Sequence, residues 1–358
     1  MRIRLFVALL SLAPAMAQAA DPAAFVESYA KEHRFSGSIL VQEEGKVVYA
    51  GSFGLASLAF KVPTTRQTPY KIASITKAFT AVLVLQLQEQ GKLDLQQPIR
   101  VYLPDYSGEG GDRITVHQLL NHTSGLPNFD TVTDAATALT KGLPTYQTPY
   151  TSDQLLSKFC SGKPVHAPGA VFDYNNCDYI VLGKIVERVS GMQYGQLLEE
   201  RILRPLGMNH TGLLRQGDII DGLADTYFQR DASGKLTGDL PVYPENWYAA
   251  GAMYSTLDDL LKFSDALFDS DLINNASRAL MIAPGLDDYG YGVWSYDTKM
   301  QGRKVHAVKR PGRIMGAQTQ LFHILEPDVT VILLGNTDTT DTDEFVSKIA
   351  KQVIVGGQ

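Results

Sequence analysis

Short apolar runs separated by turns mark both ends of the chain. The segment 37–54 carries two such runs, and the acidic turn between them ends at Gly45. Near the other end, the runs 319–325 and 329–334 flank a second turn at residues 326–328. Runs of this kind, bounded by turn residues, are typical of paired β-strands. The pattern therefore predicts a hairpin near the start and further strands near the end.

Helical patterns fill much of the remaining chain. Residues 74–90 are rich in Ala, Leu, Val and Gln, and Gly91 follows them, which predicts one long helix that ends there. From about residue 98 to residue 248, short apolar patterns with helical spacing alternate with loops that contain Pro and Gly. A last helix is predicted near the C-terminus, and its apolar residues share one face suited to packing on a sheet: Phe345, Ile349 and Val353.

Strands at both ends with helices between them indicate a discontinuous fold. We expect an α/β architecture in which one antiparallel sheet, sandwiched by helices, is built from both chain ends. The α/β sandwich domain is expected to comprise residues 21–95 and 250–358. Residues 96–249 would then form an inserted, mostly helical domain.

The first 20 residues have a different pattern, which predicts a signal peptide. Arg2 and Arg4 precede an apolar run over residues 5–13, and several A-x-A cleavage sites follow within residues 15–20. The run is too short for a membrane anchor, which needs about 20 residues. No cysteine follows it, which disfavours a lipoprotein. We expect a periplasmic or secreted protein without a membrane anchor once the signal is removed.

Composition narrows the class of partner. The 358-residue chain is 44% hydrophobic and 20% charged, which is typical of a globular protein. Removing the signal takes away two arginines, so the formal net charge changes from -6 to about -8. An acidic protein without a cluster of Lys and Arg is a poor nucleic-acid binder. The chain's two cysteines, Cys160 and Cys177, are equally consistent with a disulfide in an exported protein and with buried free thiols.

Several common catalytic patterns are absent from the sequence. It contains no G-x-S-x-G, no H-E-x-x-H and no Gly-rich phosphate loop. His117 and His122 lack zinc-ligand spacing, and we interpret both as structural. The acidic stretch 338–344 lacks the spaced ligands of a calcium loop and is better explained as an acidic helix N-terminus. We therefore expect no metal and no cofactor.

The strongest catalytic signal is the pair Ser74 and Lys77. Three positions apart on a helix, the two side chains share one face with a rise of about 4.5 Å between them. Serine is a weak nucleophile until a neighbouring base accepts its proton, and a buried lysine with a lowered pKa can be that base. Ser28 and Lys31 have the same spacing, but we interpret them as part of a solvated helix face. Ser74 instead opens the long apolar helix, where backbone N–H groups favour a developing oxyanion.

Two further motifs could complete such a site. Tyr174 lies in a loop before a helical pattern, and its phenol could relay a proton. Two residues later, the amide of Asn176 could hold both the lysine and a substrate carbonyl. Near the C-terminal strands, Arg310 could bind a substrate carboxylate, and Gly312 would permit close approach of the ligand. A tyrosine-rich loop and a basic surface turn are the alternative interpretations of these motifs.

Together these residues resemble the serine β-lactamase and penicillin-binding protein family. The resemblance is closest to its branch of class C β-lactamases, D-alanyl-D-alanine carboxypeptidases and family VIII esterases. Further phrases in the expected order support it: TVHQLLNHTSGLP at 115–127, PG at 168–169, LRPLGM at 203–208 and AAGAMYSTLDDL at 249–260. The resemblance covers nearly the whole mature chain and implies an α/β sandwich domain and a mostly helical domain with the active site in the cleft between them.

The resemblance also implies roles for individual residues. Ser74 would be the nucleophile, Lys77 its partner base, Tyr174 the proton relay and Asn176 the carbonyl anchor. The oxyanion hole would use the backbone N–H groups of Ser74 and Arg313.

The sequence departs from the family pattern at two places. Arg310-Pro311-Gly312 replaces a motif that usually has Lys or His, then a small hydroxyl residue or Gly, then Gly. Phe129 stands where class C β-lactamases usually carry a Gln that binds the substrate's acylamide. Both changes lower the expectation of efficient β-lactam turnover.

The leading hypothesis is therefore an exported serine hydrolase that forms an acyl-enzyme through Ser74. Peptide, amide or ester bonds would be cleaved, with D-amino-acid peptides and peptidoglycan fragments as the favoured small-molecule or peptide substrates. A β-lactamase is the close alternative, because the acylation machinery is shared. A protein that binds penicillin or peptidoglycan fragments without turnover is the alternative from another class. The sequence makes no prediction of the oligomeric state.

Overall fold

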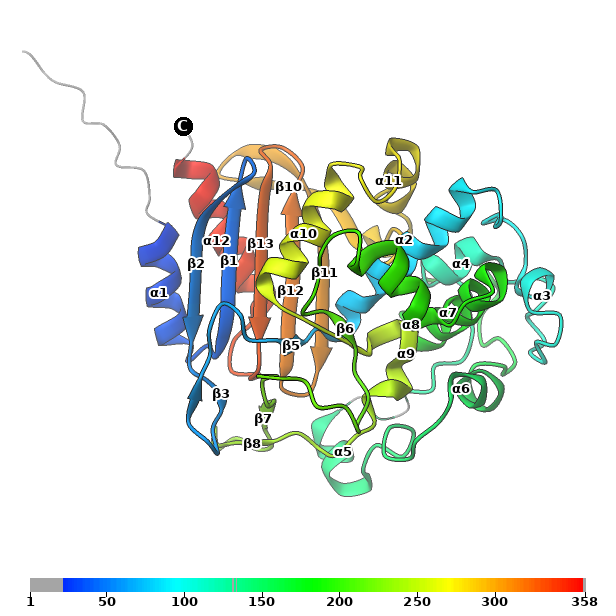
Figure 1. Cartoon of the computed structure of the whole chain (residues 1–358), viewed down its shortest axis with the longest axis horizontal. Coiled ribbons are helices and arrows are strands. Elements are labelled where there is room, and N and C mark those ends of the chain that lie inside the picture. The colour runs from blue at the N-terminus through cyan, green and yellow to red at the C-terminus, as the bar shows by residue number, and fades with distance from the viewer. Residues whose placement is uncertain (1–21, 131, 133, 357–358) are drawn as a thin grey trace, which may run out of the picture.

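The computed structural model describes residues 22–130, 132 and 134–356. The predicted signal peptide, residues 1–20, lies outside the described residues. Within the described residues, six strands form one antiparallel sheet in the order β10-β11-β12-β13-β1-β2 (Figure 1). These strands are β1 (Gly37–Glu43), β2 (Lys46–Phe53), β10 (Trp294–Met300), β11 (Arg303–Ile314), β12 (Ala317–Ile324) and β13 (Val329–Gly335).

The order of these strands joins the two ends of the chain. The N-terminal strand β1 pairs with the C-terminal strand β13, in a register that places Gly37 opposite Gly335 and Glu43 opposite Val329. The predicted hairpin over residues 37–54 is formed by β1 and β2. The predicted α/β class, with an antiparallel sheet built from both chain ends, is confirmed.

The inner strand β13 is buried on both faces of the sheet, and its alternate residues serve the two faces. On β13, Val329, Val331 and Leu333 belong to one apolar cluster, whereas Ile332 and Leu334 belong to another. Helices α1 (Pro22–Glu32) and α12 (Thr342–Gly356) contribute to the first cluster, and α2 (Thr76–Glu89) and α10 (Leu257–Phe268) to the second. Because successive side chains of a strand point to opposite faces, a strand covered on both sides has a continuous apolar sequence. This explains the uninterrupted apolar run at 331–334.

The other helices lie mainly to one side of the sheet (Figure 1). They are α3 (Ile99–Tyr102), α4 (Val116–Leu120), α5 (Ala135–Lys141), α6 (Ser152–Phe159), α7 (Asn176–Ser190), α8 (Tyr194–Leu198), α9 (Tyr248–Gly251) and α11 (Asn275–Met281). Four further helical turns among the described residues are η1 (Ala73–Ile75), η2 (Glu199–Leu203), η3 (Pro244–Trp247) and η4 (Leu286–Asp288). The division into domains at 21–95, 96–249 and 250–358 stays a prediction.

Short strands outside the main sheet connect the segments that carry the site. Strand β9 (Met253–Ser255) pairs with both β5 (Tyr70–Lys71) and β6 (Gly212–Leu213). The pairs β3 (Leu55–Ser57) with β4 (Val62–Pro63) and β7 (Tyr227–Gln229) with β8 (Leu236–Gly238) are separate. Because β5 directly precedes η1 and β9 directly follows α9, the β5–β9 pairing brings η1 beside α9.

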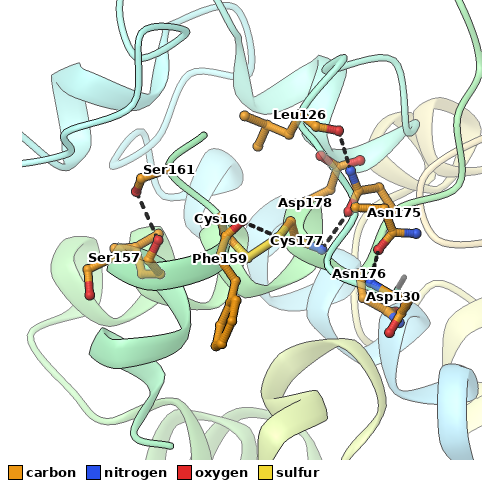
Figure 2. The surroundings of a disulfide bond; sticks show 12 residues. Leu126, Asp130, Ser157, Phe159, Cys160, Ser161, Asn175, Asn176, Cys177 and Asp178 are labelled. Carbon is orange, nitrogen blue, oxygen red and sulfur yellow. Dashed lines mark hydrogen bonds between the residues drawn. A yellow bond between two sulfur atoms is a disulfide. The ribbon is translucent and has the colours of Figure 1, made fainter. Parts of the chain in front are cut away.

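The two cysteines form a disulfide, which decides between the two alternatives that the sequence left open. Cys160 follows α6, Cys177 lies in the first turn of α7, and their Cα atoms are 5.1 Å apart. The bridge joins α6 to the helix whose first residue is Asn176 (Figure 2).

In the part of the chain that the structure describes, no helix is both long enough and apolar enough to span a membrane.

Candidate active site

Ser74 lies in a sharp turn at the start of the central helix. Its predecessor Ala73 has a φ of 47°, in the left-handed region that residues with a Cβ seldom adopt. The chain then forms η1, and α2 starts at Thr76, two residues later than the predicted helix start. Ser74 is partly exposed, whereas Ala73 and Ile75 on either side are fully buried. The turn thus presents the Ser74 hydroxyl from an otherwise buried segment.

Lys77 is one turn further along and fully buried. Its Nζ donates to Ser74 Oγ at 3.3 Å, to Asn176 Oδ1 at 2.6 Å and to the Ala250 carbonyl at 2.8 Å. Burial lowers the pKa of the Lys77 ammonium to about 8, and the nearby Arg310 charge contributes in the same direction. A lysine with this pKa can lose and regain a proton near neutral pH.

Tyr174 reaches the same serine from the loop before α7. Its hydroxyl lies 2.9 Å from Ser74 Oγ, and Arg310 Nη2 donates to that hydroxyl at 2.6 Å. Burial alone would raise the pKa of the Tyr174 phenol, but the charges of Arg310 and Lys77 outweigh burial and lower it to about 8. Two groups whose pKa values lie near 8 therefore contact Ser74 Oγ.

Arg310 is 1% exposed and uses all three guanidinium nitrogens within the protein. Besides the Tyr174 contact, Nε donates to the Ser74 carbonyl at 2.7 Å and Nη1 donates to Tyr289 Oη at 2.8 Å. The rings of Tyr174, Tyr289 and Trp294 surround the guanidinium. This geometry favours a role in holding Tyr174 over the predicted role as an anchor for a substrate carboxylate.

Strand alternation explains why only one of three neighbouring cations on β11 reaches the site. Lys309 and Arg313 both pair with Asp343 of α12, and Lys309 Nζ lies 2.8 Å from its carboxylate. Arg310, on the opposite face of the strand, points to Ser74. The predicted contribution of Arg313 to the site is its backbone N–H, which does not depend on where its side chain points.

Gly312 is predicted to permit close approach of a ligand. In the structure, the group that lies close to Gly312 is the backbone of Ile72. A Cβ added to Gly312 would lie 2.1 Å from the Ile72 carbonyl oxygen, far closer than non-bonded atoms can come. Any side chain here would therefore push β11 away from η1 and from Ser74. Gly312 thus fixes the spacing between the strand that carries Arg310 and the turn that carries the serine.

Asn176 opens α7 and orients its amide between two opposite partners. Its Oδ1 accepts from Lys77 Nζ, and its Nδ2 donates to Asp130 Oδ2 at 2.6 Å (Figure 2). The hydroxyl of Tyr146 donates to the other carboxylate oxygen of Asp130. Asp130 belongs to none of the predicted motifs, although its neighbour Phe129 departs from the family pattern. Phe129 is buried against Tyr146 and Phe159.

The loop at residues 121–127 supports the loop that carries Tyr174. The Leu126 carbonyl accepts from Asn175 Nδ2 at 2.6 Å, and the His122 carbonyl accepts from the Asp173 backbone N–H at 2.9 Å. A Cβ on Gly125, whose φ is 72°, would lie 2.3 Å from the His166 carbonyl oxygen. These contacts flank Tyr174 on its N-terminal and C-terminal sides.

A fully buried polar pair lies beneath the same loop. His122 Nδ1 is 2.8 Å from Asp178 Oδ2, and Ser124 Oγ donates to Asp178 Oδ1 at 2.5 Å. Burial lowers the pKa of His122 well below its usual value and raises the pKa of Asp178 well above its usual value. Both shifts favour the uncharged forms, which agrees with the interpretation of His122 as structural.

The structure thus brings Ser74, Lys77, Tyr174, Asn176 and Arg310 together through an unbroken set of hydrogen bonds. Sequence reasoning missed three contributors: Asp130, Tyr289 and the Ala250 carbonyl. Ala250 lies within the phrase AAGAMYSTLDDL, but a backbone carbonyl carries no residue signature. Nothing in the local sequence distinguishes Asp130 or Tyr289 from other acids and tyrosines.

Comparisons with known proteins agree with this geometry. A family model described as Beta-lactamase matches residues 22–354. Penicillin-binding protein 4* of Bacillus subtilis (strain 168) is 27% identical over 354 residues, which covers 92% of this chain and 74% of that protein.

Solved structures show the same architecture. The penicillin-binding protein from Bacillus halodurans has a TM-score of 0.78 at 27% identity, covering 91% of this chain and 99% of that chain. A D-amino acid amidase from Ochrobactrum anthropi SV3, complexed with L-phenylalanine amide, has a TM-score of 0.76 at 23% identity and covers 94% of this chain and 100% of that chain. The second likeness shows a shared fold alone. On the match over residues 22–354, the chain belongs to the Beta-lactamase family, as a hydrolase of the serine β-lactamase and penicillin-binding protein superfamily.

Proposed function

We propose that this protein is an exported serine hydrolase that cleaves peptide, amide or ester bonds through an acyl-enzyme on Ser74. One observation carries the proposal: Ser74 Oγ lies within hydrogen-bond distance of both Lys77 Nζ and Tyr174 Oη. A nucleophile whose hydroxyl contacts two groups with pKa values of about 8 can pass its proton to either of them near neutral pH.

The acylation step follows from these contacts. The Ser74 hydroxyl proton passes to the Tyr174–Lys77 pair as Oγ bonds to the substrate's carbonyl carbon. The backbone N–H groups of Ser74 and Arg313 would stabilise the oxyanion that forms. The proton then passes to the leaving nitrogen or oxygen as its bond to the carbonyl carbon breaks. Water would then attack the ester carbonyl carbon while the same pair accepts a proton from it. The bond from that carbon to Oγ would break, the pair would return the proton to Oγ, and the acid would leave.

The relatives of this protein, together with its site, support a substrate class. Penicillin-binding proteins and a D-amino acid amidase share the fold, which supports D-amino-acid peptides, D-amino-acid amides and peptidoglycan fragments. β-Lactam turnover is disfavoured because Phe129 replaces the expected Gln and the amide nitrogen of Asn176 faces Asp130. A panel of D-alanyl peptides, p-nitrophenyl esters and nitrocefin, followed to multiple turnovers, separates these substrates and excludes a protein that only binds them.

Export to the periplasm or the medium rests on two independent features. The first 20 residues have the pattern of a signal peptide, and Cys160 and Cys177 are joined, which is typical of proteins in oxidising compartments. Intact mass of the protein recovered from the periplasm or medium of an expressing bacterium measures the mature N-terminus. Recovery of the full 358-residue chain from the cytoplasm would refute export.

Labelling with a fluorophosphonate tests the nucleophile directly. One adduct is expected on the wild-type protein, and peptide mapping should locate it on Ser74. Ser74→Ala should abolish the adduct. The matched control is Ser28→Ala, which removes the serine of the second S-x-x-K pair on the exposed face of α1 and should leave labelling unchanged. An adduct that persists in Ser74→Ala would overturn the proposal.

A further inference from the structure

Asp130 is a carboxylate at the site that the proposed acylation does not use. It is partly exposed, and its two oxygens accept from Tyr146 Oη and Asn176 Nδ2. Both donors are neutral, and among residues 22–130, 132 and 134–356 the carboxylate has no ion pair. Burial raises the pKa of the Asp130 carboxyl, while the hydrogen bonds from Tyr146 and Asn176 oppose that rise. The Lys77 ammonium also lowers this pKa, but it lies beyond the Asn176 amide and makes no ion pair with the carboxylate. A cation that contacts the largely desolvated carboxylate directly gains a charge-assisted hydrogen bond.

The position of Asp130 changes what Asn176 can offer to a substrate. Asn176 Oδ1 is held by the Lys77 ammonium, so the amide nitrogen must face the other way, where Asp130 Oδ2 lies 2.6 Å from it. A substrate carbonyl that approaches this nitrogen would also meet the negative charge of Asp130. Two acceptors repel each other, whereas a donor that approaches the same place gains a charge-assisted hydrogen bond. The expected carbonyl anchor is thus a place for a hydrogen-bond donor.

Charges of opposite sign lie on the two sides of Asn176. On the far side of Asn176, Lys77 and Arg310 supply positive charge to Tyr174 and Ser74. Only the Asn176 amide separates Asp130 from Lys77, so the carboxylate is adjacent to the reacting group without contacting it. Phe129, next to Asp130, is buried in an apolar cluster and offers no acceptor or donor of its own. Recognition at this edge of the site therefore falls to the Asp130 carboxylate.

We propose that Asp130 selects substrates that carry a free, protonated amino group on the acyl side of the bond to be cleaved. Unblocked amino-acid amides and esters and peptides with a free N-terminus fit this description, whereas N-acylated substrates present a carbonyl where the carboxylate lies. The inference rests on the proposed Ser74 hydrolase and narrows its substrate class. Asp130 is a specificity residue in this scheme, whereas Lys77 takes part in proton transfer and Asn176 positions Lys77.

Protection of Ser74 from fluorophosphonate labelling tests the inference without requiring turnover. The probes are the amides of D-alanine, L-alanine, D-phenylalanine and L-phenylalanine, each used with a free amino group and as its N-acetyl derivative. For the wild-type protein, at least one unblocked amide should slow labelling at a concentration about 10- to 100-fold lower than its N-acetyl partner. Asp130→Asn should remove most of this difference, because the substituted side chain is nearly the same size but uncharged.

A control variant separates charge recognition from support of the site. Tyr146→Phe removes the other hydrogen bond to Asp130 while the carboxylate stays, so the preference for the unblocked amide should persist. A merely structural role for Asp130 would change protection by both members of a pair equally, and that result would overturn the inference. Equal protection by blocked and unblocked amides of the wild-type protein, or protection by neither, would also overturn it. Absence of any labelling of Ser74 would instead refute the hydrolase proposal on which it rests.

Discussion

The guanidinium of Arg310 lies against the phenol of Tyr174, with Nη2 2.6 Å from the hydroxyl oxygen, although the two residues are 136 positions apart. The same hydroxyl contacts Ser74 Oγ. Only the Tyr174 hydroxyl oxygen therefore lies between the guanidinium of Arg310 and the proposed nucleophile. The three guanidinium nitrogens of Arg310 donate to three different groups. A lysine ammonium at this position would reach fewer of these acceptors, because its charge is concentrated at one nitrogen. The unusual Arg310, which stands where the family usually has Lys or His, is therefore matched to a specific set of partners.

Replacing Arg310 should affect charged and neutral substrates alike. Arg310→Ala removes a charge-assisted hydrogen bond to Tyr174, and we expect kcat/KM to fall about 10- to 100-fold. Arg310→Lys should recover part of the loss because the charge returns without the forked donors. The measurement compares p-nitrophenyl acetate with an ester of similar reactivity that bears a carboxylate. A loss confined to the carboxylate substrate would restore the alternative role as a substrate anchor.

The pH dependence of acylation should reflect the Tyr174–Lys77 pair. Each group must be free of its proton before it can accept one from Ser74, and each has a pKa of about 8. The value of kcat/KM for p-nitrophenyl acetate should therefore rise with pH and level off above an apparent pKa near 8, which belongs to the pair. In Arg310→Ala the rise should move to higher pH, because the lost positive charge had lowered both pKa values. A profile that is flat from pH 6 to pH 10, a window spanning about two units on either side of that pKa, would contradict this assignment.

Lys77 and Tyr174 should act as one unit. Lys77→Ala and Tyr174→Phe should each lower the acylation rate by about 10²- to 10⁴-fold, the usual loss for a positioned proton acceptor. The double variant should be little worse than the more damaged single variant, because residues that act together are not additive. Stopped-flow acylation with an activated ester measures all four proteins. If the two losses multiply, the residues work independently.

The disulfide should stabilise the loop that carries Tyr174. Cys160 and Cys177 are separated by 17 positions, and a closed loop of this size contributes about 3 kcal/mol in the chain-entropy model. Replacing both cysteines with serine should lower the free energy of unfolding by about this amount, as measured by chemical denaturation. Reductant should destabilise the wild-type protein and leave the double variant unchanged. Two titratable thiols in unfolded, non-reduced wild-type protein would show that the bridge is absent.

Much of the local structure could be predicted because it depends on short-range patterns. The hairpin over residues 37–54 and the strands near 319–325 and 329–334 follow from apolar runs bounded by turns. The contact between Ser74 and Lys77 follows from helical spacing and its one-turn geometry. The turn at Ala73 could not be predicted, since its positive φ is imposed by packing against the intrinsic preference of alanine.

Which side chains complete the site was decided by the tertiary structure. Arg310 reaches Tyr174 because β11 presents even-numbered residues to Ser74 and odd-numbered ones to α12, and this register is set by pairing with β12. Asp130 meets Asn176 across 46 positions through the path of a loop, and nothing near Asp130 in the sequence encodes that path. By itself, the sequence indicated the proposed nucleophile pair, the strand-forming segments and the family, because each depends on neighbouring residues or on ordered motifs. The orientation of the Asn176 amide and the partners of Arg310 depend on contacts between distant segments, which exist only once the chain has packed.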